Sequence, residues 1–115
     1  MDAIFLAMDG KAARLVRPYV GNDLAIYGTS QIDSSRLGRT ALVDLTGIKF
    51  VDMPWIGMPD TDGFDLYNRT RSPSNDVERL FAMGVDAYRI ATQLLLRPQF
   101  APSIDGVTGV LTIGD

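Results

Sequence analysis

The sequence predicts an α/β fold with a small, mainly parallel sheet and flanking helices. Three short apolar segments, residues 3–8, 24–28 and 48–51, each end at polar or turn-forming residues, which is typical of strands. A helical pattern separates the first two segments, and the order strand–helix–strand is the pattern of a parallel sheet. The 115 residues, 46% of them hydrophobic, suffice for one modest core, so we expect a single domain over residues 1–115.

The first strand and the first helix occupy residues 3–20. The continuous apolar run of residues 3–8 predicts a strand that is buried on both faces. Residues 11–20 have helical spacing after a candidate N-cap at Asp9, and Pro18 is expected to end or kink this helix because it lacks a backbone N–H. The apolar face of the helix is expected to consist of Ala12, Leu15, Val16, Tyr19 and Val20.

The second and third strands follow after short connections. Residues 24–28 predict the second strand, which ends at Ser30. Residues 31–40 are polar and predict a loop, whereas residues 41–45 are compatible with a single helical turn. Residues 48–51 predict the third strand, which completes the expected parallel sheet.

Residues 53–74 differ in composition from the rest of the chain and predict a hinge or crossover segment. A short helix is expected around residues 64–70. The segment is rich in residues that interrupt helices and strands, namely Pro54, Gly57, Pro59, Gly63 and Pro73.

The longest element is a helix over residues 77–96, with Ser74 or Asn75 as N-cap and Glu78 in its first turn. Its apolar stripe consists of Val77, Leu80, Phe81, Gly84, Tyr88, Ala91 and Leu95. The polar residues that lie away from the stripe are Glu78, Arg79, Asp86, Arg89 and Gln93. Part of the helix surface is small and permits close approach of another element, at Gly84, Ala87 and Ala91.

The end of the chain predicts a turn at residues 105–109 and a terminal strand at residues 110–113. The strand assignment follows from the period-2 alternation of its apolar residues, and the turn from its two glycines.

Composition excludes several classes of function. The net charge of −3 and the pI of about 4.7 argue against binding to nucleic acid or to an anionic membrane surface. No apolar run approaches the length of a membrane span, and the first residues run directly into a strand pattern, so we expect neither a span nor a targeting signal. The chain contains no Cys and no His, which removes thiol chemistry, the usual general base and the commonest metal ligand.

Two motifs resemble functional sites only in part. Residues 28–32 approach the Gly-x-Ser-x-Gly pattern around Ser30, but the second Gly is missing and no His could accept the proton, so a strand end is the favoured interpretation. Residues 60–65 approach a calcium loop, but the Gly falls at position four and position twelve is Arg71, which favours a solvated loop. Neither motif predicts a metal or a cofactor.

The best-motivated candidate site is the edge of the sheet at the carboxyl ends of the strands. Ligands of open parallel sheets bind at this edge. The candidate cleft or partner surface therefore consists of Asp9, Ser30, Asp52, Met53 and Trp55. For Trp55, packing in the core is favoured over recognition, although tryptophan is enriched in recognition surfaces.

Five segments, taken in order, resemble one family. The most specific pieces are Asp-Met-Pro-Trp at residues 52–55 and Gly-x-Asp-Ala-Tyr-Arg at residues 84–89. The chain resembles the C-terminal domain of the LppC/LpoA lipoproteins, the penicillin-binding protein activators. The matching segments are residues 2–6 with the following Ala-Arg-Leu-Val-Arg-Pro, and residues 24–30, 47–55, 80–89 and 105–111.

The resemblance implies a fold, a location and a partner. The fold would be part of a two-lobed, type I periplasmic-binding-protein-like α/β domain, here a partial Rossmann-like lobe. The full-length protein would be an outer-membrane lipoprotein that faces the periplasm. It would regulate peptidoglycan synthesis by activating a class A penicillin-binding protein through direct contact, without being an enzyme and without a cofactor.

The resemblance also implies that the family's lipid-bearing cysteine, helical-repeat domain and first part of the two-lobed domain are not in this chain. The helix over residues 77–96 would then lack part of its partner. We expect the chain to form a dimer, or the helix to repack onto the small sheet. The alternative function is a receptor for an amino-acid-like solute, which would need a polar pocket near Asp9, Ser30 and Asp52.

Overall fold

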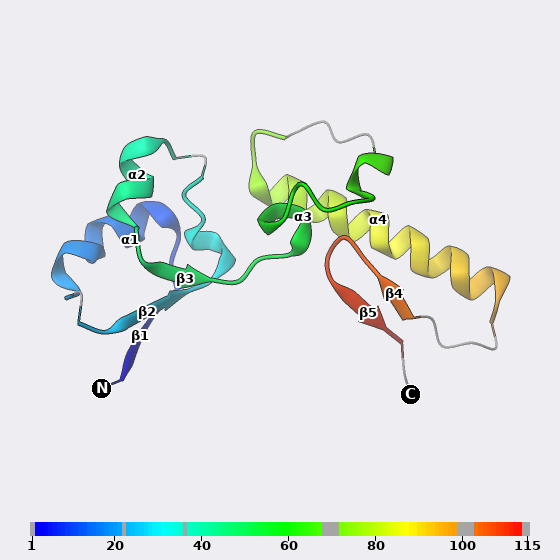
Figure 1. Cartoon of the computed structure of the whole chain (residues 1–115), viewed down its shortest axis with the longest axis horizontal. Coiled ribbons are helices and arrows are strands. Elements are labelled where there is room, and N and C mark those ends of the chain that lie inside the picture. The colour runs from blue at the N-terminus through cyan, green and yellow to red at the C-terminus, as the bar shows by residue number, and fades with distance from the viewer. Residues whose placement is uncertain (1, 22, 36, 68–71, 99–102, 114–115) are drawn as a thin grey trace. The chain divides into compact units, whose positions relative to one another are not determined.

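A computed structural model describes residues 2–21, 23–35, 37–67, 72–98 and 103–113. The chain divides into two units, Met1–Asp52 and Met53–Asp115 (Figure 1). The division falls where the predicted hinge segment begins, and the role of residues 53–74 as a hinge stays a prediction.

Three parallel strands form the sheet of the first unit. They are parallel, as the sequence predicted, and they pair in the order β1-β2-β3. The register places Leu6 opposite Gly28 and Gly28 opposite Phe50, so the three carboxyl ends lie at one edge. The strands are β1 (Ala3–Leu6), β2 (Ala25–Gly28) and β3 (Ile48–Phe50).

The helices of the first unit pack on one face of this sheet (Figure 1). Right-handed crossovers that proceed in one direction, from β1 to β2 to β3, leave both connections on the same face. The helical elements are α1 (Gly10–Val16), η1 (Arg17–Tyr19), η2 (Ser30–Ile32) and α2 (Arg39–Asp44). The core between helices and sheet consists of Leu6, Ala13, Ile26, Ile32 and Leu45.

The other face of the sheet is exposed, so the prediction that the first strand is buried on both faces is wrong. Phe5 is 65% exposed and Tyr27 is also exposed, whereas their neighbours Leu6 and Ile26 are buried. The Nζ atom of Lys49 lies 5.8 Å from the centre of the Tyr27 ring. A continuous apolar run therefore does not show how many faces of a strand are covered, because the helices supply the cover.

The cap of α1 is as predicted, and two residues of its expected apolar face, Val16 and Val20, pack against the core. Asp9 accepts a hydrogen bond from the Ala12 N–H at 2.8 Å, and the helix gives way to η1 just before Pro18. Ala13 is buried, whereas Leu15 and Tyr19, both expected on the apolar face, are exposed. The helix presents its small residues inward because η2 approaches closely.

Gly10 shows how close this approach is. A Cβ atom at Gly10 would lie 3.2 Å from the carbonyl oxygen of Ile32 and 3.0 Å from a methyl carbon of Leu37. Larger side chains on this face of α1 would push η2 away from the sheet.

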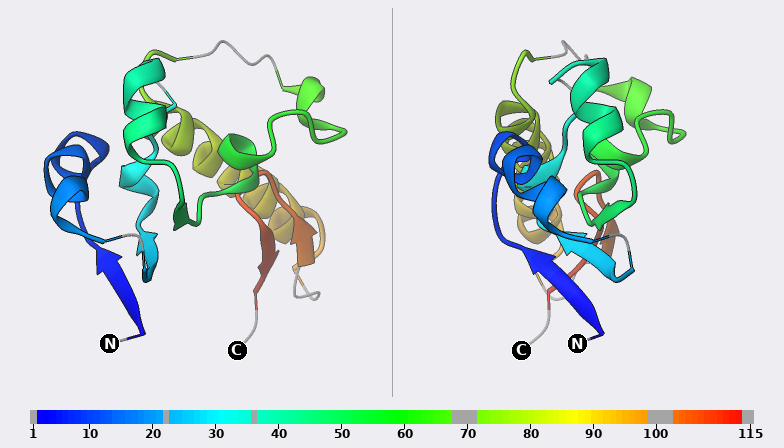
Figure 2. Two further views of the ribbon diagram at one scale, coloured as in Figure 1. Left: turned by 60° about the vertical axis from the view of Figure 1, so that its left-hand side comes forward. Right: turned by 90° about the vertical axis from the view of Figure 1, so that its left-hand side faces the viewer.

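The second unit consists of helices and a hairpin. Its elements are α3 (Pro54–Gly57), η3 (Phe64–Leu66), α4 (Asn75–Leu96), β4 (Ser103–Asp105) and β5 (Val110–Thr112). The strands β4 and β5 form an antiparallel hairpin that lies beside α4 (Figures 1 and 2). The core of this unit contains Trp55, Phe64, Ala82 and Val107.

Sequence patterns missed α3 and β4. The helix α3 has only four residues and begins at Pro54, and β4 has only three residues, so neither is long enough to produce a periodic signal. The short helix expected around residues 64–70 corresponds to η3; residues 68–71 lie outside the described residues.

The helix α4 follows Ser74, as predicted, although the Ser74 side chain makes no capping hydrogen bond. An apolar stripe normally marks the face of a helix that is buried in the core, but in α4 the stripe is not the buried face. The buried residues of α4 are Glu78, Ala82 and Asp86, and the predicted apolar stripe is exposed.

Candidate functional site

The predicted site residues of the first unit lie at one edge of the sheet. Asp9 follows β1, Ser30 follows β2 and Asp52 follows β3, and the register brings these strand ends together. Asp9 caps α1 and Ser30 begins η2, so both residues also have local structural roles.

This edge carries exposed apolar side chains. Crevices in open parallel sheets form where the strand order reverses, and the three described strands of this sheet run in the order β1-β2-β3. A pocket in the first unit lies instead on the helix side, where it is lined by Arg14, Arg17, Val43 and Asp44, among others. At the strand ends, Val51 is 86% exposed beside the partly exposed Phe50.

Trp55 was expected at this edge of the sheet, but its side chain belongs to the core of the second unit. Its side chain is fully buried. Its ring centre lies 5.3 Å from that of Phe64, 6.2 Å from that of Tyr67 and 5.6 Å from that of Phe81. Met53 is partly buried against the same cluster. The packing interpretation of Trp55 therefore holds in this structure.

The polar atoms of Trp55 are also satisfied inside the second unit. The indole Nε1–H donates to Oε2 of the buried Glu78 at 2.9 Å, and the backbone N–H donates to the carbonyl of Val107 at 3.0 Å. Glu78 also accepts a hydrogen bond from the backbone N–H of Ser72. The sequence indicated only that Glu78 stands in the first turn of a helix.

Asp86 forms a second buried hydrogen-bond cluster, which holds the hairpin turn against α4. Its carboxylate accepts hydrogen bonds from the Val107 N–H at 3.0 Å, the Thr108 N–H at 2.8 Å and the Thr108 hydroxyl at 2.6 Å. Arg89 lies 3.4 Å from the same carboxylate and donates to the Asp105 carbonyl at 3.1 Å. No sequence pattern pairs a helical Asp with a turn about 20 residues away.

The environment of Asp86 lowers its pKa. Burial raises the pKa, but hydrogen bonds from Thr108 and Val107, together with the charge of Arg89, outweigh burial and hold the pKa below the ordinary value of 3.8. The ionised form is therefore the form that the folded hairpin stabilises.

We expect this pKa shift to make the second unit acid-sensitive. A lowered folded pKa contributes stability that is present above the unfolded value of 3.8 and is lost as pH falls through the folded value. Urea unfolding between pH 7 and pH 2 should show a steeper loss in the unchanged chain than in Asp86→Asn, which cannot titrate at this position. Parallel pH profiles for the two proteins would contradict this assignment.

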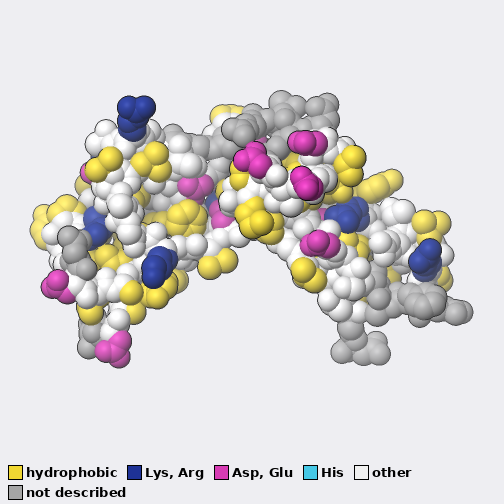
Figure 3. Space-filling model, in the orientation of Figure 1, with side chains coloured by type: hydrophobic (Ala, Val, Ile, Leu, Met, Phe, Trp, Pro, Cys, Tyr) yellow, Lys and Arg dark blue, Asp and Glu magenta, His cyan; other side chains and the backbone are white. Residues whose placement is uncertain are grey.

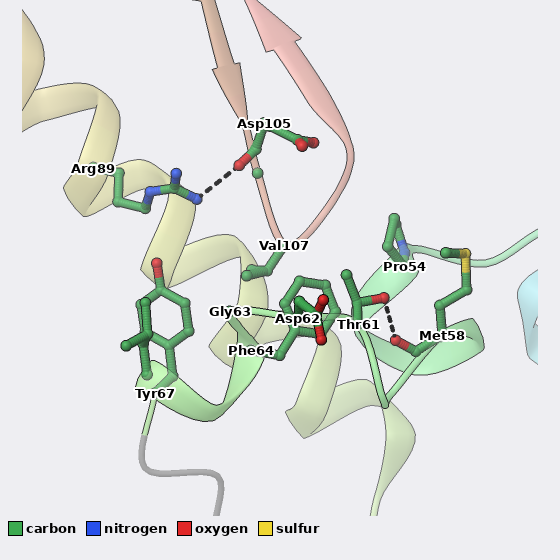
Figure 4. A pocket seen from close by; sticks show the side chains of 12 residues that line it. Pro54, Met58, Thr61, Asp62, Gly63, Phe64, Tyr67, Arg89, Asp105 and Val107 are labelled. Atoms are coloured by element: carbon green, nitrogen blue, oxygen red, sulfur yellow. Dashed lines mark hydrogen bonds between the residues drawn. The ribbon is translucent and has the colours of Figure 1, made fainter.

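An open pocket of about 400 Å³ lies beside this cluster (Figure 4). Its lining includes the apolar side chains of Phe64 and Val107 and the charged side chains of Arg89 and Asp62. Acidic side chains gather over the α3–η3 segment on one face of this unit (Figure 3). Across the described ranges, however, no three acidic residues are grouped so that they could hold a metal ion.

Two residues that line the pocket form hydrogen bonds within their own unit. Arg89 donates to the Asp105 carbonyl, and the Thr61 hydroxyl donates to the Met58 carbonyl at 2.7 Å (Figure 4).

The parallel sheet with helices on one face, followed at its third strand exit by a helix-and-hairpin unit, defines part of a periplasmic-binding-protein-like α/β domain. A solved structure described as "a putative branched-chain amino acid ABC transporter" from Chromobacterium violaceum is 39% identical. It superposes with a TM-score of 0.78 over 98% of this chain and 37% of that one. The C-domain of LpoA from Haemophilus influenzae, described as a regulator of PBP1A, has the same fold, with a TM-score of 0.74 and 21% identity over 99% of this chain and 38% of that one.

The chain belongs to the LppC family: the model described as "LppC putative lipoprotein" matches residues 1–115. A curated relative from Vibrio cholerae, named penicillin-binding protein activator LpoA, is 28% identical over 126 residues, which cover 100% of this chain and 20% of the relative. A relative of the same name from Dickeya chrysanthemi is 25% identical over 97% of this chain and 17% of its own length. The chain thus spans about a fifth of the length of these relatives.

Proposed function

We propose that this chain is part of a non-enzymatic regulator of peptidoglycan synthesis, which activates a class A penicillin-binding protein by direct contact. Membership of the LppC family supports this, as do curated relatives that are named penicillin-binding protein activators. The absence of His and Cys from the sequence fits a role in binding better than one in catalysis.

We assign the contact to the strand-end edge of the first unit. The observation that carries this assignment is the 86% exposure of Val51, an apolar residue between Phe50 and Asp52 at the end of β3. An exposed apolar residue beside charged and hydroxyl side chains suits a partner surface with an apolar centre and a polar rim. Asp9, Ser30 and Asp52 would supply that rim.

The substitution Val51→Asp should weaken binding to the transpeptidase-containing region of the same organism's class A synthase at least tenfold. A charge placed in a desolvated apolar contact is costly, whereas an exposed site tolerates the change without loss of folding. Interferometry with the purified 115-residue chain would measure the dissociation constant.

Val43→Asp is the matched control, because Val43 is 71% exposed but lies on α2. If both variants weakened binding to the synthase equally, the loss would come from the change in net charge and not from the strand-end edge. Loss of binding in Leu80→Glu but not in Val51→Asp would move the contact to α4 and overturn the assignment.

The alternative function, a receptor for an amino-acid-like solute, is favoured by the open pocket beside Arg89. The structural relative described as "a putative branched-chain amino acid ABC transporter" adds to this alternative. Calorimetric titration with leucine separates the two functions. Saturable heat of binding that is lost in Arg89→Ala would support the receptor function, whereas absence of binding heat would favour the activator function.

We also propose that the full-length protein is attached to the outer membrane and faces the periplasm, which family membership supports. None of the helices in the described part of the chain combines the length and apolar character required to cross a bilayer. Self-association of this chain is a further part of the proposal.

A further inference from the structure

The chain contains three Asp-Gly pairs, each at a turn or at the start of a helix. They are Asp9-Gly10, Asp62-Gly63 and Asp105-Gly106. An Asp-Gly pair can rearrange without an enzyme, because glycine has no side chain to keep its backbone nitrogen away from the carboxyl carbon of the aspartate. The rearrangement needs a carboxyl group and an amide nitrogen that are both free to move, so local structure decides which pair can react.

Local contacts hold the first and the third pair. The Asp9 carboxylate accepts the Ala12 N–H at 2.8 Å as the cap of α1. In the hairpin turn, the Gly106 N–H donates to the Gly109 carbonyl at 2.9 Å, and Gly106 is buried against Asp86. Each of these pairs would have to lose a hydrogen bond made by one of its two reacting groups.

The middle pair lies in an exposed turn of the second unit. Asp62 and Gly63 are both exposed and occupy the two central positions of a β-turn. The Phe64 N–H closes this turn by donating to the Thr61 carbonyl at 3.2 Å. Gly63 has φ 91° and ψ −13°, whereas Asp62 has no positive φ, which is the pattern of a type II turn with glycine at its preferred position.

Both reacting groups of this pair are unengaged. Across the residues that the structure describes, the Asp62 carboxylate accepts no hydrogen bond and the Gly63 N–H donates none. Figure 4 shows Asp62 among the residues that line the pocket, with no hydrogen bond to any of them. In a type II turn the Gly63 nitrogen points away from the Asp62 carboxyl carbon, so their peptide group must rotate before the two atoms can meet. The rotation needs the hydrogen bond that closes the turn to open, and hydrogen bonds in exposed turns open at a low cost in free energy.

We propose that Asp62-Gly63 is a site of spontaneous isoaspartate formation. The Gly63 nitrogen attacks Cγ of Asp62 in its acid form, the N–Cγ bond forms, and the carboxyl OH leaves as water with the amide proton. Water then adds to the backbone carbonyl carbon of Asp62 within the resulting five-membered ring, and the bond from that carbon to nitrogen breaks. One water is lost and one is gained, and the backbone now passes through Cβ and Cγ. This inference is independent of the proposed function.

The modified turn would act on the core of the second unit. Isoaspartate adds one methylene group to the backbone just before η3, whose buried Phe64 has its ring centre 5.3 Å from that of Trp55. Because closely packed interiors tolerate little displacement of a ring, the modified chain should unfold at a lower urea concentration than the fresh chain.

Incubation of the folded 115-residue chain at pH 6 and 37 °C, in water enriched in oxygen-18, tests the site. Peptide mapping should find isoaspartate with incorporated oxygen-18 at residue 62, at least tenfold more than at Asp9 or Asp105. Methylation by a protein isoaspartate methyltransferase with labelled S-adenosylmethionine gives an independent count. Because the reaction consumes the acid form of the carboxyl group, it should be slower at pH 8 than at pH 6. In urea, where the contacts of all three pairs are lost, the three rates should agree within a few-fold.

Asp62→Glu should remove the isoaspartate at this position, because glutamate would need a less favourable six-membered ring. Asp60→Glu is the matched control, since Asp60 is exposed in the same loop, and it should leave the yield at residue 62 unchanged. Asp62→Asn should react faster and release ammonia, because it forms the same ring by losing its amide nitrogen. Absence of isoaspartate at residue 62, equal yields at the three pairs of the folded chain, or an unreactive Asp62→Asn would overturn the proposal.

Discussion

Replacing Trp55 by alanine is expected to unfold the second unit. The substitution removes the largest fully buried side chain, against which the rings of Phe64, Tyr67 and Phe81 pack. It also leaves the buried carboxylate of Glu78 without its indole donor. Large-to-small changes of this kind cost about 3–5 kcal/mol, which equals or exceeds the stability expected of a unit this small.

The variant Trp55→Phe separates the two contributions. It keeps an aromatic ring in the core but removes the Nε1–H, so its cost should be about 1–3 kcal/mol, the range for an unsatisfied buried group. Circular dichroism during urea unfolding would measure both variants, since neither retains a tryptophan. Native-like unfolding of Trp55→Ala would show that α3 and α4 hold together without the indole.

Replacing Asp86 by alanine is expected to detach the hairpin from α4. Three donors, the Val107 N–H, the Thr108 N–H and the Thr108 hydroxyl, would lose their shared acceptor in a buried site. Removing one member of such a network costs about 3–5 kcal/mol. Amide hydrogen exchange should show the turn amides of Val107 and Thr108 losing protection.

Gly106→Ala tests the same contact from the other side. An added Cβ would lie 2.5 Å from Oδ2 of Asp86 and 2.8 Å from the carbonyl oxygen of Gly109, so the turn would have to move. Gly57→Ala is the matched control, since a Cβ at Gly57 has no neighbouring atom within 4 Å. Equal stability of Gly106→Ala and Gly57→Ala would contradict the tight docking of the turn.

The strands of the first unit could be predicted because each is a short apolar segment with a clear end. The parallel pairing followed from the order of strands and helices, and the end of α1 followed from Pro18. These features depend on local sequence, where propensity and backbone geometry decide the result.

The buried faces of the helices could not be predicted in the same way. In α4, the carboxylates of Glu78 and Asp86 face inward because an indole N–H and two turn amides from distant segments need acceptors. Periodicity identifies an apolar stripe but not the partner that covers it. In α1, η2 approaches so closely at Gly10 that small residues are buried on this face, whereas Leu15 is exposed.

The candidate site was predicted in part. The sheet register places Asp9, Ser30 and Asp52 at one edge, as the parallel pattern implied. Trp55 was included because it follows Asp52 closely in sequence, yet it is buried in the second unit. The neighbouring Val51 was overlooked as a surface residue, because an apolar residue at a strand end is indistinguishable from a core residue in sequence.

The backbone of Val107 is held from both sides: its carbonyl accepts from the Trp55 N–H, and its own N–H donates to Asp86. Trp55 opens the second unit and Val107 lies in its last hairpin. During synthesis, Trp55 therefore leaves the ribosome long before the peptide group of Val107 that accepts its backbone N–H. Almost the whole second unit must therefore be synthesised before its core can form. Because contacts between distant residues form slowly, the aromatic residues stay accessible to chaperones until then.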